Sequence, residues 1–241
     1  MRYAKKLLGP DWLNGYAIAW SFGALLALCL LPLFLFGKIR VRGYWRAFRA
    51  MGRGNVILAA NHPEGMTPFL IPALFCPGYL LIPRFYPWNV PREGLVPSFL
   101  LVPFRCIVVQ RGNRLQKMAA AKKLIHLLRE SGNILIFPEG TRTVDETNPD
   151  RELVRMNGRS IRPIKETGVP FIAQSSNARV VPVWIDIPDV TRKLKFWKSV
   201  AHLLEPGRRM TIRFGEPYRI GKENFNVDAE NARLQNLILT T

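Results

Sequence analysis

Cysteine is scarce in this sequence, and the placement of the few cysteines excludes several kinds of site. The 241 residues include three, Cys29, Cys76 and Cys106, and none stands in a CxxC pair or in His/Cys metal spacing. Each lies in an apolar stretch, as is typical of small buried hydrophobic side chains in a reducing compartment. We therefore expect neither a metal site nor a cofactor that depends on thiolate ligands.

Acidic residues are also scarce, with 17 Asp and Glu against 35 Lys and Arg, so the formal net charge is +18 at pH 7. This excess indicates an anionic partner: nucleic acid, an anionic membrane surface, an acidic carrier protein or a phosphate-bearing substrate. The sequence lacks helix-turn-helix, zinc-finger and RNP patterns, so we expect no nucleic acid partner. It also lacks a G-x-S-x-G elbow, which disfavours a serine hydrolase.

Charged side chains are missing from residues 12–37, the most apolar part of the chain. About 20 apolar residues are enough to cross a bilayer as a helix. Basic residues flank the run on both sides, so the positive-inside rule gives no orientation. Three alternatives stay open: a spanning helix, a helix pair that enters one leaflet and returns with a bend at Gly23 or Pro32, and a core helix.

The residues after this run are strongly basic, with Lys38, Arg40, Arg42, Arg46 and Arg49 close together. Basic residues beside an apolar membrane segment suit anionic lipid headgroups. We therefore expect the protein at the cytoplasmic face of the cell membrane, with anionic membrane lipids as partners. The chain then divides into a membrane anchor with a basic segment at residues 1–50 and a domain at residues 51–241.

From residue 56 onward, β-type runs alternate with helical ones. The β-type runs are Val56–Ala60, Cys106–Val109, Ile134–Phe137, Val180–Ile185 and Met210–Phe214. Residues 114–130 have apolar positions at helical spacing, with Asn113 and Gly132 as candidate caps. The alternation predicts an α/β fold with a mixed, largely parallel sheet flanked by helices.

Three further segments carry weaker expectations. Residues 79–92 are rich in proline and aromatic residues and are expected to form an ordered loop. Residues 191–204 are basic and amphipathic, and fit either a helix on the membrane interface or an ordinary surface helix. Asp228 is a candidate cap for a last helix that runs to Leu239. His126 and His202 are expected to be structural or surface residues.

The first informative motif is residues 61–68, Asn-His-Pro-Glu-Gly-Met-Thr-Pro, which follows the β-type run at 56–60. A strand that ends in His62, followed by a turn and a helix start, is a good place for a general base. The strand fixes the histidine backbone, and the helix start offers backbone N–H groups. Taken alone, a histidine at such a place is more often an ordinary loop histidine, so the rest of the sequence has to decide.

The second motif is Phe137-Pro138-Glu139-Gly140-Thr141-Arg142, at the end of another β-type run. Gly140 lets the backbone turn and approach a ligand closely. Thr141 and Arg142 offer a hydroxyl and a guanidinium, which suit a phosphate. Glu139 has a structural alternative, because a glutamate in such a turn often accepts backbone N–H bonds.

Together with Asn61-His62 and Val181-Pro182-Val183, this motif resembles the glycerolipid acyltransferase family, whose best-known members are the 1-acylglycerol-3-phosphate acyltransferases. The resemblance covers roughly residues 52–218. It implies transfer of an acyl group from acyl-CoA or an acyl-carrier protein to a hydroxyl of lysophosphatidic acid or a related lysolipid. His62 would be the general base, and no cofactor or metal is implied.

The resemblance also implies the substrate-binding residues. Cys106–Arg111 looks like the family's strand that ends in an arginine, and Arg84 falls near a basic position of the family. The implied substrate-binding set is Arg84, Arg111, Glu139, Gly140, Thr141 and Arg142. The arginines would hold the acceptor phosphate and so place its hydroxyl near His62.

One position departs from the family pattern. The family's first motif is His-x-x-x-x-Asp, whose carboxylate orients the histidine and stabilises its charged form, but here the fifth residue after His62 is Thr67. Three alternatives stay open. Glu64 replaces the carboxylate; or Thr67, or a carboxylate from elsewhere such as Glu139, orients His62; or the protein is a catalytically impaired relative that binds lipid or acyl carrier.

Overall fold

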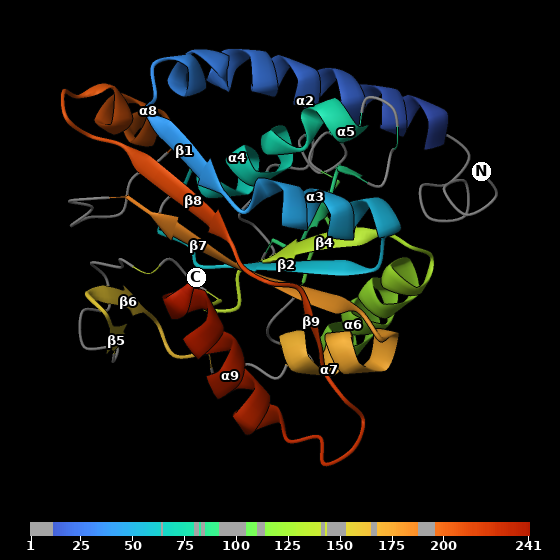
Figure 1. Cartoon of the computed structure of the whole chain (residues 1–241). Helices are drawn as coiled ribbons and strands as arrows, with labels where there is room; N and C mark the ends of the chain where they lie inside the picture. Colours follow the sequence, from blue (N-terminus) through green and yellow to red (C-terminus); the bar gives the residue numbers. More distant parts are fainter. Residues whose placement is uncertain are drawn as a thin grey trace.

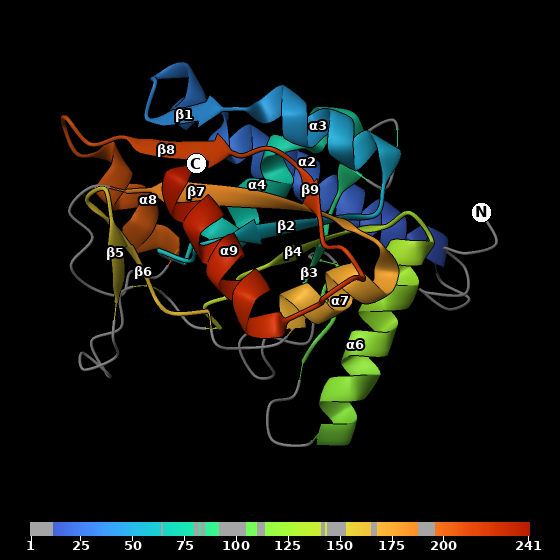
Figure 2. The same cartoon turned by 60° about the horizontal axis from the view of Figure 1, so that its bottom comes forward.

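The computed structural model describes residues 12–63, 65–79, 82, 85–91, 105–109, 114–140, 143, 153–164, 168–187 and 196–241. In these residues a seven-stranded sheet forms the centre of the molecule, and helices cover both of its faces (Figures 1 and 2). The strand order is β1-β8-β7-β2-β4-β3, with β9 paired to β7 off this path. The strands of this sheet are β1 (Ile39–Arg42), β2 (Val56–Ala60), β3 (Trp88–Asn89), β4 (Asn133–Ile136), β7 (Arg179–Asp186), β8 (Met210–Phe214) and β9 (Tyr218–Arg219).

The central strands are parallel, as the alternation of strands and helices predicts. β2 pairs in parallel with β4 on one side and β7 on the other, β3 pairs in parallel with β4, and β1 with β8. Only β8 and β9 run antiparallel to their neighbour β7. The expected α/β class with a mixed, largely parallel sheet is therefore confirmed. A separate antiparallel hairpin is formed by β5 (Val154–Met156) and β6 (Arg159–Ile161).

The helices form two layers. α2 (Trp12–Leu35), α3 (Tyr44–Arg53), α4 (Thr67–Leu74), α5 (Cys76–Tyr79) and α8 (Phe196–Leu204) lie on one side of the sheet. α6 (Arg114–Arg129), α7 (Gly168–Ser176) and α9 (Val227–Thr240) cover the other side. Parallel strands require crossover connections, and these connections place helices on both faces.

The sequence of β2 shows why this strand occupies the centre. All five of its residues are buried. Val56, Leu58 and Ala60 belong to the core under α2, α3 and α4, whereas Ile57 and Ala59 belong to the core under α6, α7 and α9. Successive side chains of a strand point to opposite faces, so a strand covered on both faces has to be apolar throughout.

The strand pattern differs in detail from expectation in two places. Cys106–Val109 lies beside β3: Cys106 forms an isolated parallel bridge with Asn89, and Ile107 N and Val109 N donate to Asn89 O and Pro91 O. β3 itself lies in the segment expected to be a loop. Arg105, just before this run, has a φ of 47°, and its backbone oxygen accepts from Asn89 N (3.0 Å). β1 lies in the segment expected to belong to a membrane anchor, yet it pairs with β8 in the main sheet.

The helix ends also differ in detail from expectation. Ser131, rather than Gly132, takes the left-handed position after α6, with a φ of 63°. The N–H of Gly132 donates to Leu127 O and that of Ser131 to Leu128 O, which is the Schellman pattern. The last helix is capped by Asn226, whose side chain accepts from the N–H groups of Asp228 and Ala229.

α2 is one continuous helix of 24 residues with Pro32 inside it, so the expected helix pair with a bend at Gly23 or Pro32 is not observed. Leu26, Leu30 and Leu33 lie on its inner face and are buried in the core that contains α4. No helix in the described residues has the length and apolar character needed to cross a membrane, so the spanning alternative is not supported. The inner face of α2 is packed in the core, as the core-helix alternative expects.

The outer face of α2 is also apolar. Its exposed large side chains recur along the helix and continue just past its end: Trp20, Leu25, Leu28, Leu31, Leu35 and Phe36. These residues are called the outer stripe below. Most surface helices carry polar residues on the side that faces away from the core, so an apolar outer face of this length marks an interaction surface.

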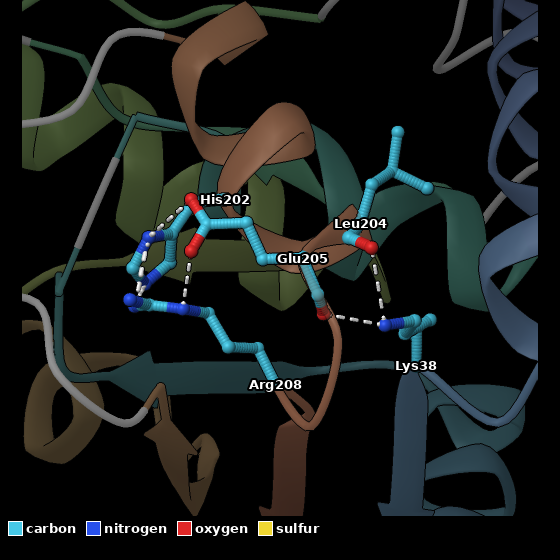
Figure 3. Close-up of polar contacts among 5 residues, drawn as sticks. All are labelled: Lys38, His202, Leu204, Glu205 and Arg208. Carbon is cyan, nitrogen blue, oxygen red and sulfur yellow. Dashed lines mark hydrogen bonds and ion pairs between the residues drawn. The ribbon is translucent and has the colours of Figure 1, made fainter.

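α8 covers only part of the segment expected to be amphipathic, since residues 191–195 lie outside the described ranges. Ser199 and Leu203 are buried, whereas Lys198 and Leu204 are exposed. Its end is tied to β1 by Lys38, whose ammonium group donates to the backbone oxygens of Leu204 (3.3 Å) and Glu205 (2.7 Å), as Figure 3 shows. α8 therefore packs as a surface helix of the domain.

Candidate active site

His62 lies two residues beyond β2, at the carboxyl end of the central parallel strand. Asn61 continues the strand pairing with its side chain: Nδ2 donates to Ile185 O (2.9 Å), and Oδ1 accepts from Ile185 N (2.6 Å). The amide thus replaces the next peptide group of the ladder with β7. Asn61 is 1% exposed, so this pair forms in the core and fixes the residue before His62.

The ring of His62 is held on two sides. Its Nδ1 lies 2.9 Å from Thr67 Oγ1, and its plane stacks on Phe137 with 4.4 Å between ring centroids. Thr67 begins α4 and is completely buried, and His62 itself is partly exposed. Of the alternatives left open by the sequence, Thr67 is therefore the group seen to contact the ring, through a neutral hydroxyl.

Glu139 contacts the backbone of His62 rather than its ring. Glu139 Oε1 accepts from His62 N (2.8 Å) and from the Thr143 hydroxyl (2.9 Å), and Oε2 accepts from Arg162 N (2.9 Å). The carboxyl group is buried, with only 7% of the residue exposed. These contacts agree with the structural alternative for Glu139, and its assignment as a substrate-binding residue stays a prediction.

The two sequence motifs meet at this point. Thr143 N donates to His62 O (2.9 Å), so the chain just after the second motif is joined to the start of the first. Gly140 has a φ of 69°, and its N–H donates to Phe137 O, which closes the turn that brings Glu139 under His62. This left-handed conformation is open to glycine without steric cost, as expected for the position.

The remaining expected site residues lie outside the described ranges: Glu64, Arg84, Arg111, Thr141 and Arg142. Their roles stay predictions from the sequence. Within the described residues, no three His, Cys, Asp or Glu side chains are grouped so that they could hold a metal ion.

The other two histidines are placed as expected. His126 is exposed on α6. His202 on α8 lies against the guanidinium of Arg208, with 2.6 Å between its Nε2 and Arg208 Nη1, and Arg208 also pairs with Glu205 (Figure 3). His202 therefore belongs to a structural cluster that joins the end of α8 to the start of β8.

Three contributors to the site were not identified from the sequence. Asn61 was noted only as part of its motif, and neither Thr143 nor Arg162 was singled out. Thr143 stands directly after the second motif, so its hydroxyl was a visible signal. Arg162 follows a hairpin strand with no motif around it, and only the tertiary fold brings its N–H to Glu139.

Comparison with known proteins identifies the family. The family model described as "Acyltransferase" matches residues 38–186, which is more than half of the chain. The chain belongs to the acyltransferase family. The resemblance inferred from the two motifs is thereby confirmed, and the matched range contains both of them.

Two individual acyltransferases are similar to this chain. A 1-acyl-sn-glycerol-3-phosphate acyltransferase of Borreliella burgdorferi is 31% identical over 90 residues, which are 37% of this chain and 34% of that protein. The match thus spans about a third of the relative's length. The crystal structure of the 1-acyl-sn-glycerophosphate (LPA) acyltransferase PlsC from Thermotoga maritima has the same fold, with a TM-score of 0.56 at 18% identity. That similarity covers 93% of this chain and 77% of PlsC.

The first prediction concerns the pH dependence of stability. Burial raises the pKa of the Glu139 carboxyl to about 7, although the hydrogen bonds from Arg162, His62 and Thr143 act to lower it. A carboxyl whose pKa is higher in the folded state than in the unfolded state stabilises the fold fully below the unfolded pKa, 4.5, and this contribution is lost as the pH rises through 7. At 1.36 kcal/mol per unit, the change is about 3 kcal/mol.

The measurement is the free energy of unfolding of wild type and Glu139→Gln between pH 4.5 and 8. The difference, wild type minus variant, should fall by about 3 kcal/mol over this range. A constant difference, or one that increases with pH, would show that the three donors dominate over burial.

Proposed function

We propose that the protein transfers an acyl group from a thioester, acyl-CoA or acyl-carrier protein, to a hydroxyl of lysophosphatidic acid or a related lysolipid. The observation that carries the proposal is the placement of His62: its backbone is fixed by Glu139 and its Nδ1 by the buried Thr67 hydroxyl. Family membership supports the reaction type, and the names of the two similar enzymes support the acceptor.

In the proposed reaction His62 is the general base. Because Nδ1 contacts Thr67, Nε2 is the nitrogen that we assign to the acceptor hydroxyl. As Nε2 takes the proton, the hydroxyl oxygen attacks the thioester carbonyl carbon. The tetrahedral intermediate then collapses with cleavage of the C–S bond, and the leaving thiolate takes the proton back from the imidazolium to give a free thiol.

The oxyanion of the tetrahedral intermediate needs backbone N–H donors, and the segment between His62 and α4 is the place to look for them. In the first turn of α4, Pro68 has no N–H, and the N–H groups of Phe69 and Leu70 both donate to Met66 O (3.0 Å). We therefore assign the oxyanion to N–H groups between Pro63 and Pro68, next to the His62 ring.

The acceptor phosphate is assigned to the arginines expected from the sequence, Arg84, Arg111 and Arg142, with the Thr141 hydroxyl beside them. A guanidinium pairs with phosphate through two parallel hydrogen bonds, which fixes both position and orientation. Binding the phosphate in this way would convert attack by the hydroxyl into an effectively intramolecular step.

The residue at position 67 favours a second candidate function, because the family pattern has an aspartate where this chain has Thr67. A threonine hydroxyl orients an imidazole, but it does not stabilise the imidazolium as a carboxylate does. In serine proteases, loss of the corresponding carboxylate's charge costs about 10⁴ in rate. A membrane-associated relative that binds lipid or acyl carrier with little turnover is therefore the alternative.

We also propose that the protein docks on the cytoplasmic surface of an anionic membrane. The outer stripe of α2 supplies the apolar part, with Leu28 66% and Leu35 75% exposed. Arg40, Arg42 and Arg49, in the adjoining β1 and α3, are exposed and basic. An apolar face flanked by basic residues is the pattern of an interfacial helix on anionic lipid.

The test of the catalytic proposal is turnover by His62→Ala. Loss of a general base costs about 10²–10⁴ in rate, so release of free thiol from acyl-CoA or acyl-carrier protein with lysophosphatidic acid should fall by that factor. His126→Ala, at an exposed histidine on α6, is the matched control and should leave the rate unchanged. Equal rates for wild type and His62→Ala would leave only the binding function.

A further prediction concerns Thr67. Thr67→Asp should raise kcat by about tenfold or more, because the new carboxylate stabilises the imidazolium formed in the transition state. Thr67→Val removes the hydroxyl with little change in volume and should lower kcat about fivefold, in line with one hydrogen bond of about 1 kcal/mol. Thr67→Ser, which keeps the hydroxyl, is the control. Full activity in Thr67→Val would mean that another group orients His62.

Membrane docking is tested by the double variant Leu28→Gln/Leu35→Gln. Binding to vesicles that contain phosphatidylglycerol should weaken by at least tenfold, because burial of each leucine is worth about 1.5–3 kcal/mol. Leu115→Gln, at an exposed leucine on α6, is the control. If the double variant binds as well as wild type while Leu204→Gln on α8 does not, the docking surface is α8.

A further inference from the structure

Arg162 is a buried arginine that the proposed reaction does not use directly. Only 4% of its surface is exposed, and it follows directly after β6 in the β5–β6 hairpin. A buried guanidinium is costly unless it is paired and hydrogen-bonded, so its contacts indicate what it does. These contacts lead to His62.

Two bonds join Arg162 to the active-site loops. Its backbone N–H donates to Glu139 Oε2 (2.9 Å), and its Nε–H donates to Thr143 O (3.2 Å). Its guanidinium also lies close enough to Glu139 for a favourable charge interaction. Glu139 and Thr143 are the two residues that hold the His62 peptide, through His62 N (2.8 Å) and His62 O (2.9 Å). These four residues are called the Glu139 hub below.

The hairpin that carries Arg162 is itself fixed from the other side. Arg159 Nη1 donates to Leu239 O at the end of α9 (2.6 Å), and Ile164 N donates to the Gln235 side chain of the same helix (3.2 Å). The hairpin lies beside α9 in both views (Figures 1 and 2). A continuous series of bonded groups therefore leads from α9 through Arg162 to the backbone of His62.

We propose that Arg162 is a positioning residue for His62: it holds Glu139 and Thr143, and through them sets where the His62 ring lies relative to the acceptor hydroxyl. This inference rests on the proposed function in treating His62 as the base. Arg162 does not touch the reacting atoms. Its loss changes the rate because a catalytic group displaced by about 1 Å loses up to about 10² in rate.

The test is Arg162→Met, which keeps the length of the side chain and the backbone N–H bond to Glu139 Oε2, but removes the guanidinium charge and the Nε–H donor to Thr143 O. We expect kcat to fall 10- to 100-fold with KM within twofold of wild type, because substrate binding is assigned to other residues. Arg162→Lys keeps the charge but not the Nε–H donor to Thr143 O, and should give an intermediate kcat. The control is Arg155→Met on β5 of the same hairpin, where the side chain is exposed and the rate should not change.

Amide hydrogen exchange tests the hub without reference to activity. In Arg162→Met, the N–H groups of His62 and Thr143, which are bonded within the hub, should exchange at least tenfold faster than in wild type. The amides of β2 (Val56–Ala60) should keep their protection, because the ladder with β4 and β7 does not depend on Arg162.

The outcomes separate the two proposals. If His62→Ala is fully active, acyl transfer with His62 as base is wrong, but local loss of protection in Arg162→Met still supports the hub. Unchanged kcat and unchanged exchange at His62 and Thr143 would overturn the role of Arg162. Loss of protection across β2 as well would also overturn it, because Arg162 would then be a residue of general stability.

Discussion

A buried carboxyl group joins the parts of this site. Glu139 accepts hydrogen bonds from the loop after β2, from the loop after β4 and from the hairpin that contains Arg162. These segments are distant in the sequence, and without this acceptor the backbone N–H groups of His62 and Arg162 and the Thr143 hydroxyl would lose their partner. A buried donor left unpaired costs about 1–3 kcal/mol. The need to satisfy several donors at one place therefore fixes the loops relative to one another and gives His62 a defined backbone.

Glu139 and Thr67 contact different parts of His62. The Glu139 carboxyl accepts from the backbone of His62, whereas the Thr67 hydroxyl lies against Nδ1 of the His62 ring. The resemblance to the family implies an aspartate at the position of Thr67, so in this chain the residue at that position offers His62 a hydroxyl.

The residues that were predictable from the sequence are those whose role is local. The five apolar residues of β2, the turn glycine Gly140 and the histidine at a strand end all carry their signal in their immediate neighbours. β1 was missed because its alternation of apolar and basic residues was interpreted as a membrane-proximal segment. Arg162 was missed because its partners, Glu139 and Thr143, are distant in sequence, and no spacing rule connects them. The sequence indicated the position of the site, and the tertiary fold shows which groups support it.

The inner face of α2 has a consequence for how the domain meets a flat surface. Leu26, Leu30 and Leu33 are buried in the core and hold α2 against the domain. The leucines of the outer stripe therefore keep a fixed orientation relative to the sheet. A protein held to a surface by a flexible segment can rotate freely above it. A helix packed into the core, as α2 is, instead fixes the tilt of the whole domain relative to the surface. On the lipid surface proposed above, every adsorbed molecule would present the same rim of the sheet at the same height, and substrates that diffuse laterally would encounter an entrance of constant orientation.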